Sequence, residues 1–170
     1  MYIRNVKKED FDLIYNFVKE AFETAAVKDG DEQDYVLKWR AGESYIPELE
    51  FVAVENGEIV GHIMLRWLKV LTDKGAYMAL IVAPLSVKLD MRGKGIGAAL
   101  MNTAFEKAKG LGYSAAFLAG DPNYYKRFGF KPMGEFGIEN RTAVPGQFAL
   151  ACEIVDGALK NINGYIEYLE

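Results

Sequence analysis

The spacing of apolar residues divides the first part of the chain into a strand and two helices. Residues 1–6, "MYIRNV", alternate in the manner of a strand, and residues 9–25 carry apolar side chains at helical spacing. A second, shorter helix is expected within residues 29–42, with Asp31 as its cap and Gly42 as its end. The pattern therefore predicts one strand followed by two helices.

The clearest local signal is a hairpin. Two apolar, β-rich runs flank Asn56 and Gly57, the residue pair that tight hairpin turns favour. A third long strand is expected at residues 76–88, "AYMALIVAPLSVK", and it contains Pro84. Because proline has no N–H to donate to a sheet, this strand is expected to be bulged or unpaired on one side there.

The pattern then indicates a helix that begins at Gly95 and ends at Gly110 and Gly112. A buried strand, a short helix leading into a strand, and a late strand are expected at residues 113–119, 122–130 and 147–155. This order is not a regular βαβ series. It predicts an α+β fold with a mixed sheet, and the length of 170 residues predicts a single domain over residues 1–170.

Composition narrows the functional classes. The formal net charge is −4, without a long block of like charges, which argues against general nucleic-acid binding. No apolar run is long enough to span a membrane, and the charged N-terminal stretch lacks the features of a signal peptide. The single cysteine, Cys152, cannot form an internal disulfide, so an intracellular, cytoplasmic location is expected.

The stretch "RGKGIG", at residues 92–97, is the strongest chemical signal. Glycines at the start of a helix can serve a tight turn alone, or they can admit a phosphate group to the unpaired N–H groups of the helix. Gly93, Gly95 and Ala98 also fit the loose dinucleotide pattern, with Asp121 at the end of the next strand. Against a dinucleotide fold, charged residues separate the strand from Gly93, and too little chain follows Asp121 for a second half.

The same stretch resembles the acetyl-CoA pyrophosphate loop of the GNAT superfamily of N-acetyltransferases, with Arg92, Gly95 and Gly97 at the motif positions. The later stretch "GDPNYYKRFGFKP" resembles the closing segment of that family, at Tyr125, Gly129 and Phe130, in the form found in small bacterial predicted acetyltransferases. The resemblance implies a GNAT-like fold with a splayed sheet. It also implies direct transfer of an acetyl group from acetyl-CoA to a primary amine, while a non-catalytic acetyl-CoA sensor is the competing interpretation.

The resemblance assigns roles to individual residues. Tyr125 matches the tyrosine that protonates the departing CoA thiolate, and the adjacent Tyr124 is an alternative. The strand is expected to splay at Pro84, which frees backbone groups for the pantetheine arm. The residues expected to bind the cofactor are Leu85, Ser86, Val87, Arg92, Gly93, Lys94, Gly95, Ile96, Gly97 and Ala98. No metal is expected, and the acceptor is expected to be a small-molecule or peptide amine.

The general base is not evident in the sequence. The strand at residues 76–88 contains no Asp, Glu or His. For His62, the only histidine, burial or ordinary packing is expected rather than catalysis, and Glu20 and Glu23 are weaker candidates still. Deprotonation through water fits the absence of a candidate equally well. Cys152 is expected to pack as a small apolar residue. The family resemblance also admits a homodimer.

Overall fold

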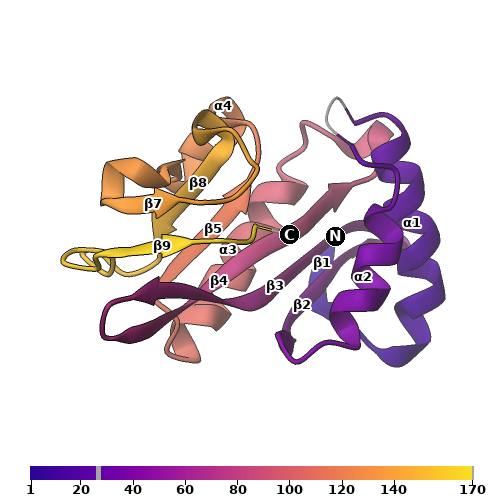
Figure 1. Cartoon of the computed structure of the whole chain (residues 1–170). Coiled ribbons are helices and arrows are strands. Elements are labelled where there is room, and N and C mark those ends of the chain that lie inside the picture. The colour runs from indigo at the N-terminus through magenta and orange to yellow at the C-terminus, as the bar shows by residue number, and fades with distance from the viewer. Residues whose placement is uncertain (26–27, 170) are drawn as a thin grey trace. The chain divides into compact units, whose positions relative to one another are not determined.

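The computed structural model describes residues 1–25 and 28–169, and it is shown in Figure 1. The chain forms two compact units. Unit 1 comprises Met1–Arg66 and Ala83–Lys107, and unit 2 comprises Trp67–Val82 and Ala108–Glu170. Two long strands, β3 (Glu58–Thr72) and β4 (Gly75–Val87), contribute residues to both units.

The first elements agree with the apolar pattern, and α1 and α2 lie together beside β1 and β2 in Figure 1. They are β1 (Tyr2–Asn5), η1 (Lys8–Asp10), α1 (Phe11–Glu23) and α2 (Glu32–Arg40). The start of α2 differs in detail from the expectation. Asp31 occupies the N-cap position, but its side chain makes no capping bond. The Glu32 carboxylate instead accepts the N–H groups of Asp29 (2.6 Å) and Gly30 (3.1 Å).

The expected hairpin is confirmed. It joins β2 (Tyr45–Glu55) to β3, and its two turn residues, Asn56 and Gly57, have φ angles of 51° and 82°. Positive φ at both positions is the geometry of a type I′ turn, whose twist matches that of the flanking strands. The edge strand β1 pairs with β2 in antiparallel fashion.

Helices cover both faces of the unit 1 sheet. On one face, buried residues of α1, α2, β2 and β3 form a core: Ile14, Val18, Val36, Val52, Val54 and Met64. On the other face, Gly61 of β3 lies under α3 (Ile96–Gly110). A Cβ atom on Gly61 would stand only 2.8 Å from Leu100 Cδ1 and 2.9 Å from Ile96 Cγ2, so the glycine permits the close approach of this helix.

The remaining elements are the other strands of a mixed sheet and the short helices between them. They are η2 (Leu89–Met91), β5 (Ala115–Ala119), α4 (Pro122–Tyr125), η3 (Lys126–Phe128), β6 (Lys131–Pro132), η4 (Met133–Phe136), β7 (Ile138–Asn140), η5 (Gly146–Phe148), β8 (Ala149–Glu153) and β9 (Gly164–Ile166). The strand order is β1-β2-β3-β4 in unit 1 and β3-β4-β5-β8-β6 in unit 2. In unit 2, β9 also pairs with β3 and β7.

Parallel and antiparallel pairs occur together, which confirms the predicted α+β class. The β4–β5 pair is parallel, at Leu80↔Ala116 and Ile81↔Phe117, and the register ends before Pro84 is reached. The β5–β8 pair is antiparallel and holds Cys152 opposite Ala116. The short strands β7 and β9 pair in parallel near the end of the chain.

Candidate functional site

The glycine loop, residues 92–98, connects η2 to the first turn of α3. Gly93 and Gly95 have φ angles of +75° and +82°, values that residues with a Cβ atom rarely adopt. A Cβ atom built on either glycine would meet nothing within 4 Å. The backbone of the loop therefore borders open space at both glycines.

The start of α3 presents backbone donors that have no acceptor among the described residues. The first N–H that returns into the helix is that of Ala99, which donates to Gly95 O at 3.0 Å. The N–H groups of Gly95, Ile96, Gly97 and Ala98 precede it and have no acceptor within the helix. Together with the helix dipole, such a set of donors suits an anion, and a phosphate in particular.

The Arg92 side chain donates hydrogen bonds to two backbone carbonyl groups. Its Nε donates to Val87 O at 3.1 Å, and its Nη2 donates to Ala21 O at 2.7 Å. Ala21 lies in the last turn of α1, where unpaired carbonyl groups attract a positive charge. The guanidinium thus ties the end of β4 to the end of α1. Lys94 lies on the surface, with its Nζ 3.4 Å from Met91 Sδ.

The last residues of β4 lead directly into the loop. Lys88, immediately after the strand, donates its backbone N–H to Val60 O at 3.0 Å, so β4 runs beside β3 up to this point. Ser86 is only 4% exposed, and among the described residues its Oγ has no hydrogen-bond partner. Leu85, Ser86 and Val87 therefore adjoin the loop, as the sequence indicated.

A pocket of about 620 Å³ opens between α1 and η2 in unit 1. It is lined by Phe17, Glu20, Ala21, Glu23, Lys88, Leu89 and Asp90. Lys88 forms an ion pair with Glu58 at 3.0 Å, and the Glu58 carboxylate, with Asp90 and Glu20 nearby, raises the pKa of Lys88. The two weaker base candidates, Glu20 and Glu23, thus lie next to the residues that precede the glycine loop.

The tyrosine segment, residues 120–130, is a short, capped helix. The Asp121 carboxylate accepts the N–H of Asn123 at 2.8 Å, and Gly129 ends the following 3-10 turn with a φ of 85°. The Tyr125 ring centroid lies 4.9 Å from that of Tyr124 and 5.8 Å from that of Phe130. Tyr125 is therefore held within an aromatic cluster.

Gly120 leaves room for the Tyr125 ring because it has no side chain. A Cβ atom on Gly120 would stand 2.6 Å from Tyr125 Cε2, which is too close for any other residue without displacement of the ring. Burial, together with the neighbouring Tyr124 and Asp121, raises the pKa of Tyr125, so its hydroxyl keeps its proton at neutral pH. Burial also raises the pKa of Tyr124, although Arg127, whose guanidinium lies 4.5 Å from the ring centroid, opposes that shift.

Sequence reasoning missed a buried polar cluster on the α1–α2 face of unit 1. Glu50 is 0% exposed, and its carboxylate accepts hydrogen bonds from Arg40 Nε (3.1 Å), Tyr45 OH (2.6 Å) and His62 Nε2 (2.7 Å). Burial alone would raise the pKa of Glu50, but the bonds from His62 and Arg40 outweigh it and hold this pKa at about 2. The expected burial of His62 is confirmed, at 0% exposed.

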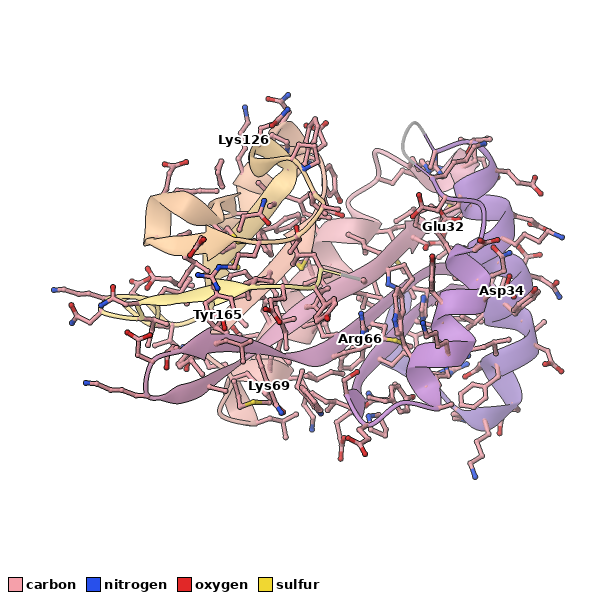
Figure 2. All side chains as sticks on the ribbon, viewed as in Figure 1. Glu32, Asp34, Arg66, Lys69, Lys126 and Tyr165 are labelled. Carbon is pink, nitrogen blue, oxygen red and sulfur yellow. The ribbon has the colours of Figure 1, made fainter. Side chains whose placement is uncertain are left out.

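A second arginine in this region has no acidic partner among the described residues. Arg66, labelled in Figure 2, projects from β3 toward α2, and its guanidinium lies 4.1 Å from the ring centroid of Trp39. Its Nη1 is 3.4 Å from Ser44 Oγ, while its Nε and Nη2 have no partner among the described side chains. Burial lowers the pKa of Arg66 to about 10.

The single cysteine lies in the interior. Cys152 is 1% exposed, and burial raises the pKa of its thiol to about 12, so the residue serves packing rather than nucleophilic chemistry.

Within residues 1–25 and 28–169, no three His, Cys, Asp or Glu side chains gather in a way that could hold a metal ion. None of the helices in the same residues is long and apolar enough to cross a membrane.

The mixed sheet, the glycine loop before α3 and the capped tyrosine segment are the features on which the resemblance to the GNAT family rests. A family model described as "Acetyltransferase (GNAT) domain" matches residues 2–133, and the chain belongs to this family. The uncharacterized N-acetyltransferase YjhQ of Escherichia coli is 33% identical over 110 residues, which are 65% of this chain. The aligned part spans 61% of the length of YjhQ.

Solved structures agree in fold. The E. coli protein YhbS, determined in complex with CoA, has a TM-score of 0.86 at 24% identity, and the match covers 98% of this chain and 88% of YhbS. A GNAT family acetyltransferase from Brucella melitensis, determined in complex with acetyl-CoA, has a TM-score of 0.70 at 30% identity, covering 76% of this chain and 82% of that protein. The GNAT fold predicted from the sequence is thereby confirmed.

Proposed function

We propose that this chain transfers the acetyl group of acetyl-CoA to a primary amine by direct attack within a ternary complex. The observation that carries the proposal is the glycine loop, whose unpaired N–H groups and left-handed glycines border open space at the start of α3. The Brucella relative, at 30% identity, was determined with acetyl-CoA, which supports the same cofactor here.

The proposed roles follow from local geometry. The N–H groups of Gly95, Ile96, Gly97 and Ala98 hold the pyrophosphate, and Arg92 keeps the loop in place through its two carbonyl bonds. Backbone groups of Leu85, Ser86 and Val87 bind the pantetheine arm. One of these N–H groups stabilises the oxyanion that forms when the amine attacks the thioester.

Tyr125 is proposed as the general acid. The amine nitrogen forms the new C–N bond, the C–S bond breaks, and the leaving thiolate takes the phenolic proton of Tyr125. Burial raises the pKa of Tyr125, which makes its hydroxyl a weaker acid, so the proposed role rests on the position of Tyr125 in the motif and not on its pKa. The two units are proposed to act as one domain, since the structural match to YhbS covers 98% of the chain.

The direct test uses purified protein, acetyl-CoA and a panel of small-molecule and peptide amines. Amine-dependent release of CoA thiol, with the acetylated product identified by mass, is the expected result. Thermal stabilisation by CoA and not by NAD excludes the dinucleotide interpretation. An acetyl-CoA sensor remains the second candidate, because β4 supplies no Asp, Glu or His as a base. Stabilisation by acetyl-CoA without turnover on any amine would favour the sensor.

A further inference from the structure

Two buried polar side-chain atoms on neighbouring strands of unit 1 have no hydrogen-bond partner within the part of the chain that the structure describes. His62 on β3 is 0% exposed and Ser86 on β4 is 4% exposed. Among the described residues, neither His62 Nδ1 nor Ser86 Oγ has a hydrogen-bond partner. Because buried polar side-chain atoms are nearly always paired, two such atoms on adjacent strands call for a functional explanation.

The Glu50 carboxylate determines which ring nitrogen of His62 is a donor. Hydrogen bonds from His62 and Arg40 outweigh the effect of burial on the pKa of Glu50, so the carboxylate stays ionised at neutral pH and can only accept a hydrogen bond. His62 Nε2, 2.7 Å from Glu50 Oε1, must therefore carry the ring proton. The Nδ1 atom has no hydrogen-bond partner among the described residues, and the relay proposed below requires it to be without a proton, which the nitrogen NMR experiment tests.

The strand register brings Ser86 opposite His62. The backbone N–H of Lys88 donates to Val60 O at 3.0 Å, and β3 and β4 are adjacent in the sheet. In an antiparallel pair, the residue two before the donor faces the residue two after the acceptor. Ser86 and His62 hold these two positions. They do not bond to each other in the structure, and the relay requires a Ser86 χ1 rotamer that directs the hydroxyl toward the ring.

Ser86 also belongs to the segment that is proposed to hold the pantetheine arm. It lies between Leu85 and Val87, and the Val87 carbonyl is bound by Arg92 of the glycine loop at 3.1 Å. Ser86 is therefore part of the proposed cofactor segment and lies opposite His62 on the neighbouring strand. β4 itself offers no acidic or imidazole side chain.

We propose that Ser86 and His62 form the proton relay that deprotonates the attacking amine, an inference that rests on the proposed acetyl transfer. The first ammonium proton passes to Ser86 Oγ as the Ser86 proton passes to His62 Nδ1. The neutral nitrogen then forms the C–N bond, the C–S bond breaks, and the thiolate takes its proton from Tyr125. The second proton of the nitrogen leaves through solvent and restores Tyr125. The Glu50 carboxylate stabilises the transient imidazolium, which finally releases its proton to solvent.

The first experiment does not require turnover. His62 is the only histidine, so the nitrogen NMR spectrum of labelled protein contains a single imidazole ring. We expect a neutral ring with its proton on Nε2, and an Nδ1 resonance that moves in Ser86→Ala when acetyl-CoA is bound. A proton on Nδ1, or an Nδ1 resonance that is identical in Ser86→Ala, would overturn the relay whether or not the wild type is active.

The second experiment separates proton transfer from structure. Ser86→Ala removes an unpaired buried hydroxyl, so the unfolding temperature should hold or rise while kcat falls about 10²-fold and KM for acetyl-CoA stays unchanged. His62→Gln keeps a donor for Glu50 but accepts no proton, and should lower kcat similarly. Since both act in one relay, the double variant should be no slower than either single variant. Ser44→Ala is the matched serine control.

The pH dependence provides the decisive contrast. As pH rises, more of the amine arrives already neutral, so both variants should approach wild-type turnover, which a structural defect would not permit. Wild-type turnover in both variants at neutral pH would refute the relay alone. A wild type that transfers to no amine, although its ring shows the expected tautomer, would refute the proposed acetyl transfer instead.

Discussion

The glycine loop and the tyrosine segment are opposite kinds of site. In the loop, Gly93 and Gly95 border open space, and the groups offered to a ligand belong to the backbone. In the tyrosine segment, the half-buried Tyr125 ring packs against its aromatic neighbours, and a Cβ atom on Gly120 would stand 2.6 Å from it. A glycine in the first case keeps space free for a ligand, and in the second case makes space for a side chain of the protein itself.

Because of this difference, equivalent substitutions in the two regions should impair acetyl transfer in different ways. A side chain added to the loop intrudes on the cofactor and should weaken binding. A side chain added beside Tyr125 displaces a ring and should slow the chemical step. The separation of KM from kcat is therefore the measurement that tests the comparison.

The largest effect is expected from Gly95→Val. Its side chain would enter the space over the loop and oppose the left-handed φ of +82°, so KM for acetyl-CoA should rise about 10²-fold or more, or binding should disappear. Isothermal titration with CoA measures this directly. Gly157→Val is the matched control, because Gly157 has the same φ of +82° and open surroundings outside the loop. Equal loss of CoA binding in both variants would contradict the assignment.

Tyr125→Phe should leave cofactor binding intact and lower kcat by about 10²-fold, because the ring stays packed and only the acidic hydroxyl is removed. Steady-state kinetics over a range of acetyl-CoA concentrations separates the two parameters. Tyr124→Phe, on the adjacent ring 4.9 Å away, is the matched control. A large fall in Tyr124→Phe with none in Tyr125→Phe would transfer the role of acid to Tyr124.

A smaller effect, about 10-fold in kcat, is expected from Gly120→Ala. The added Cβ would lie 2.6 Å from the Tyr125 ring, which must then move away from its working position. Gly134→Ala is the control, because a Cβ there would meet nothing within 4 Å. If kcat in Gly120→Ala equals that of the wild type, the exact place of the Tyr125 ring does not matter for transfer.

The smallest effect is expected from Arg92→Met, and it appears without any cofactor. Loss of the bonds to Val87 O and Ala21 O should reduce the free energy of unfolding by about 1 kcal/mol. Chemical denaturation of the ligand-free protein measures this. Lys94→Met, in the same loop without such bonds, should unfold like the wild type. A phosphate contact as the sole role of Arg92 would instead leave the stability of the free protein unchanged.

Local signals explain what the sequence could reveal. Asn56 and Gly57 encode their turn by their own backbone preferences, and the loop glycines are recognisable because few residues tolerate positive φ. Long-range partners carry no such signal. Arg92 binds a carbonyl at Ala21, and β9 pairs with β3 at Leu71↔Tyr165, in both cases far apart along the chain.

The buried polar cluster around Glu50 was missed for the same reason, because its partners are not neighbours in the sequence. His62 could be placed in the interior from its apolar neighbours, but nothing near it in sequence identified Glu50 as its partner on the adjacent strand. Asp31 illustrates the opposite error. It is a favourable capping residue at the expected position, yet its side chain makes no capping bond, and the Asp34 N–H donates to the Asp31 backbone carbonyl at 2.9 Å. Residue type alone does not specify which oxygen of the cap residue takes that N–H.

The burial of Cys152 has a practical consequence for anyone who handles the protein. It is the only cysteine in the chain, and at 1% exposed with a pKa of about 12 it offers almost no thiolate to a reagent. Colorimetric thiol reagents should therefore report released CoA without a background from the native enzyme. For the same reason, a cysteine introduced on the surface would be the single point of attachment for a fluorophore or spin label, with no need to remove the natural one.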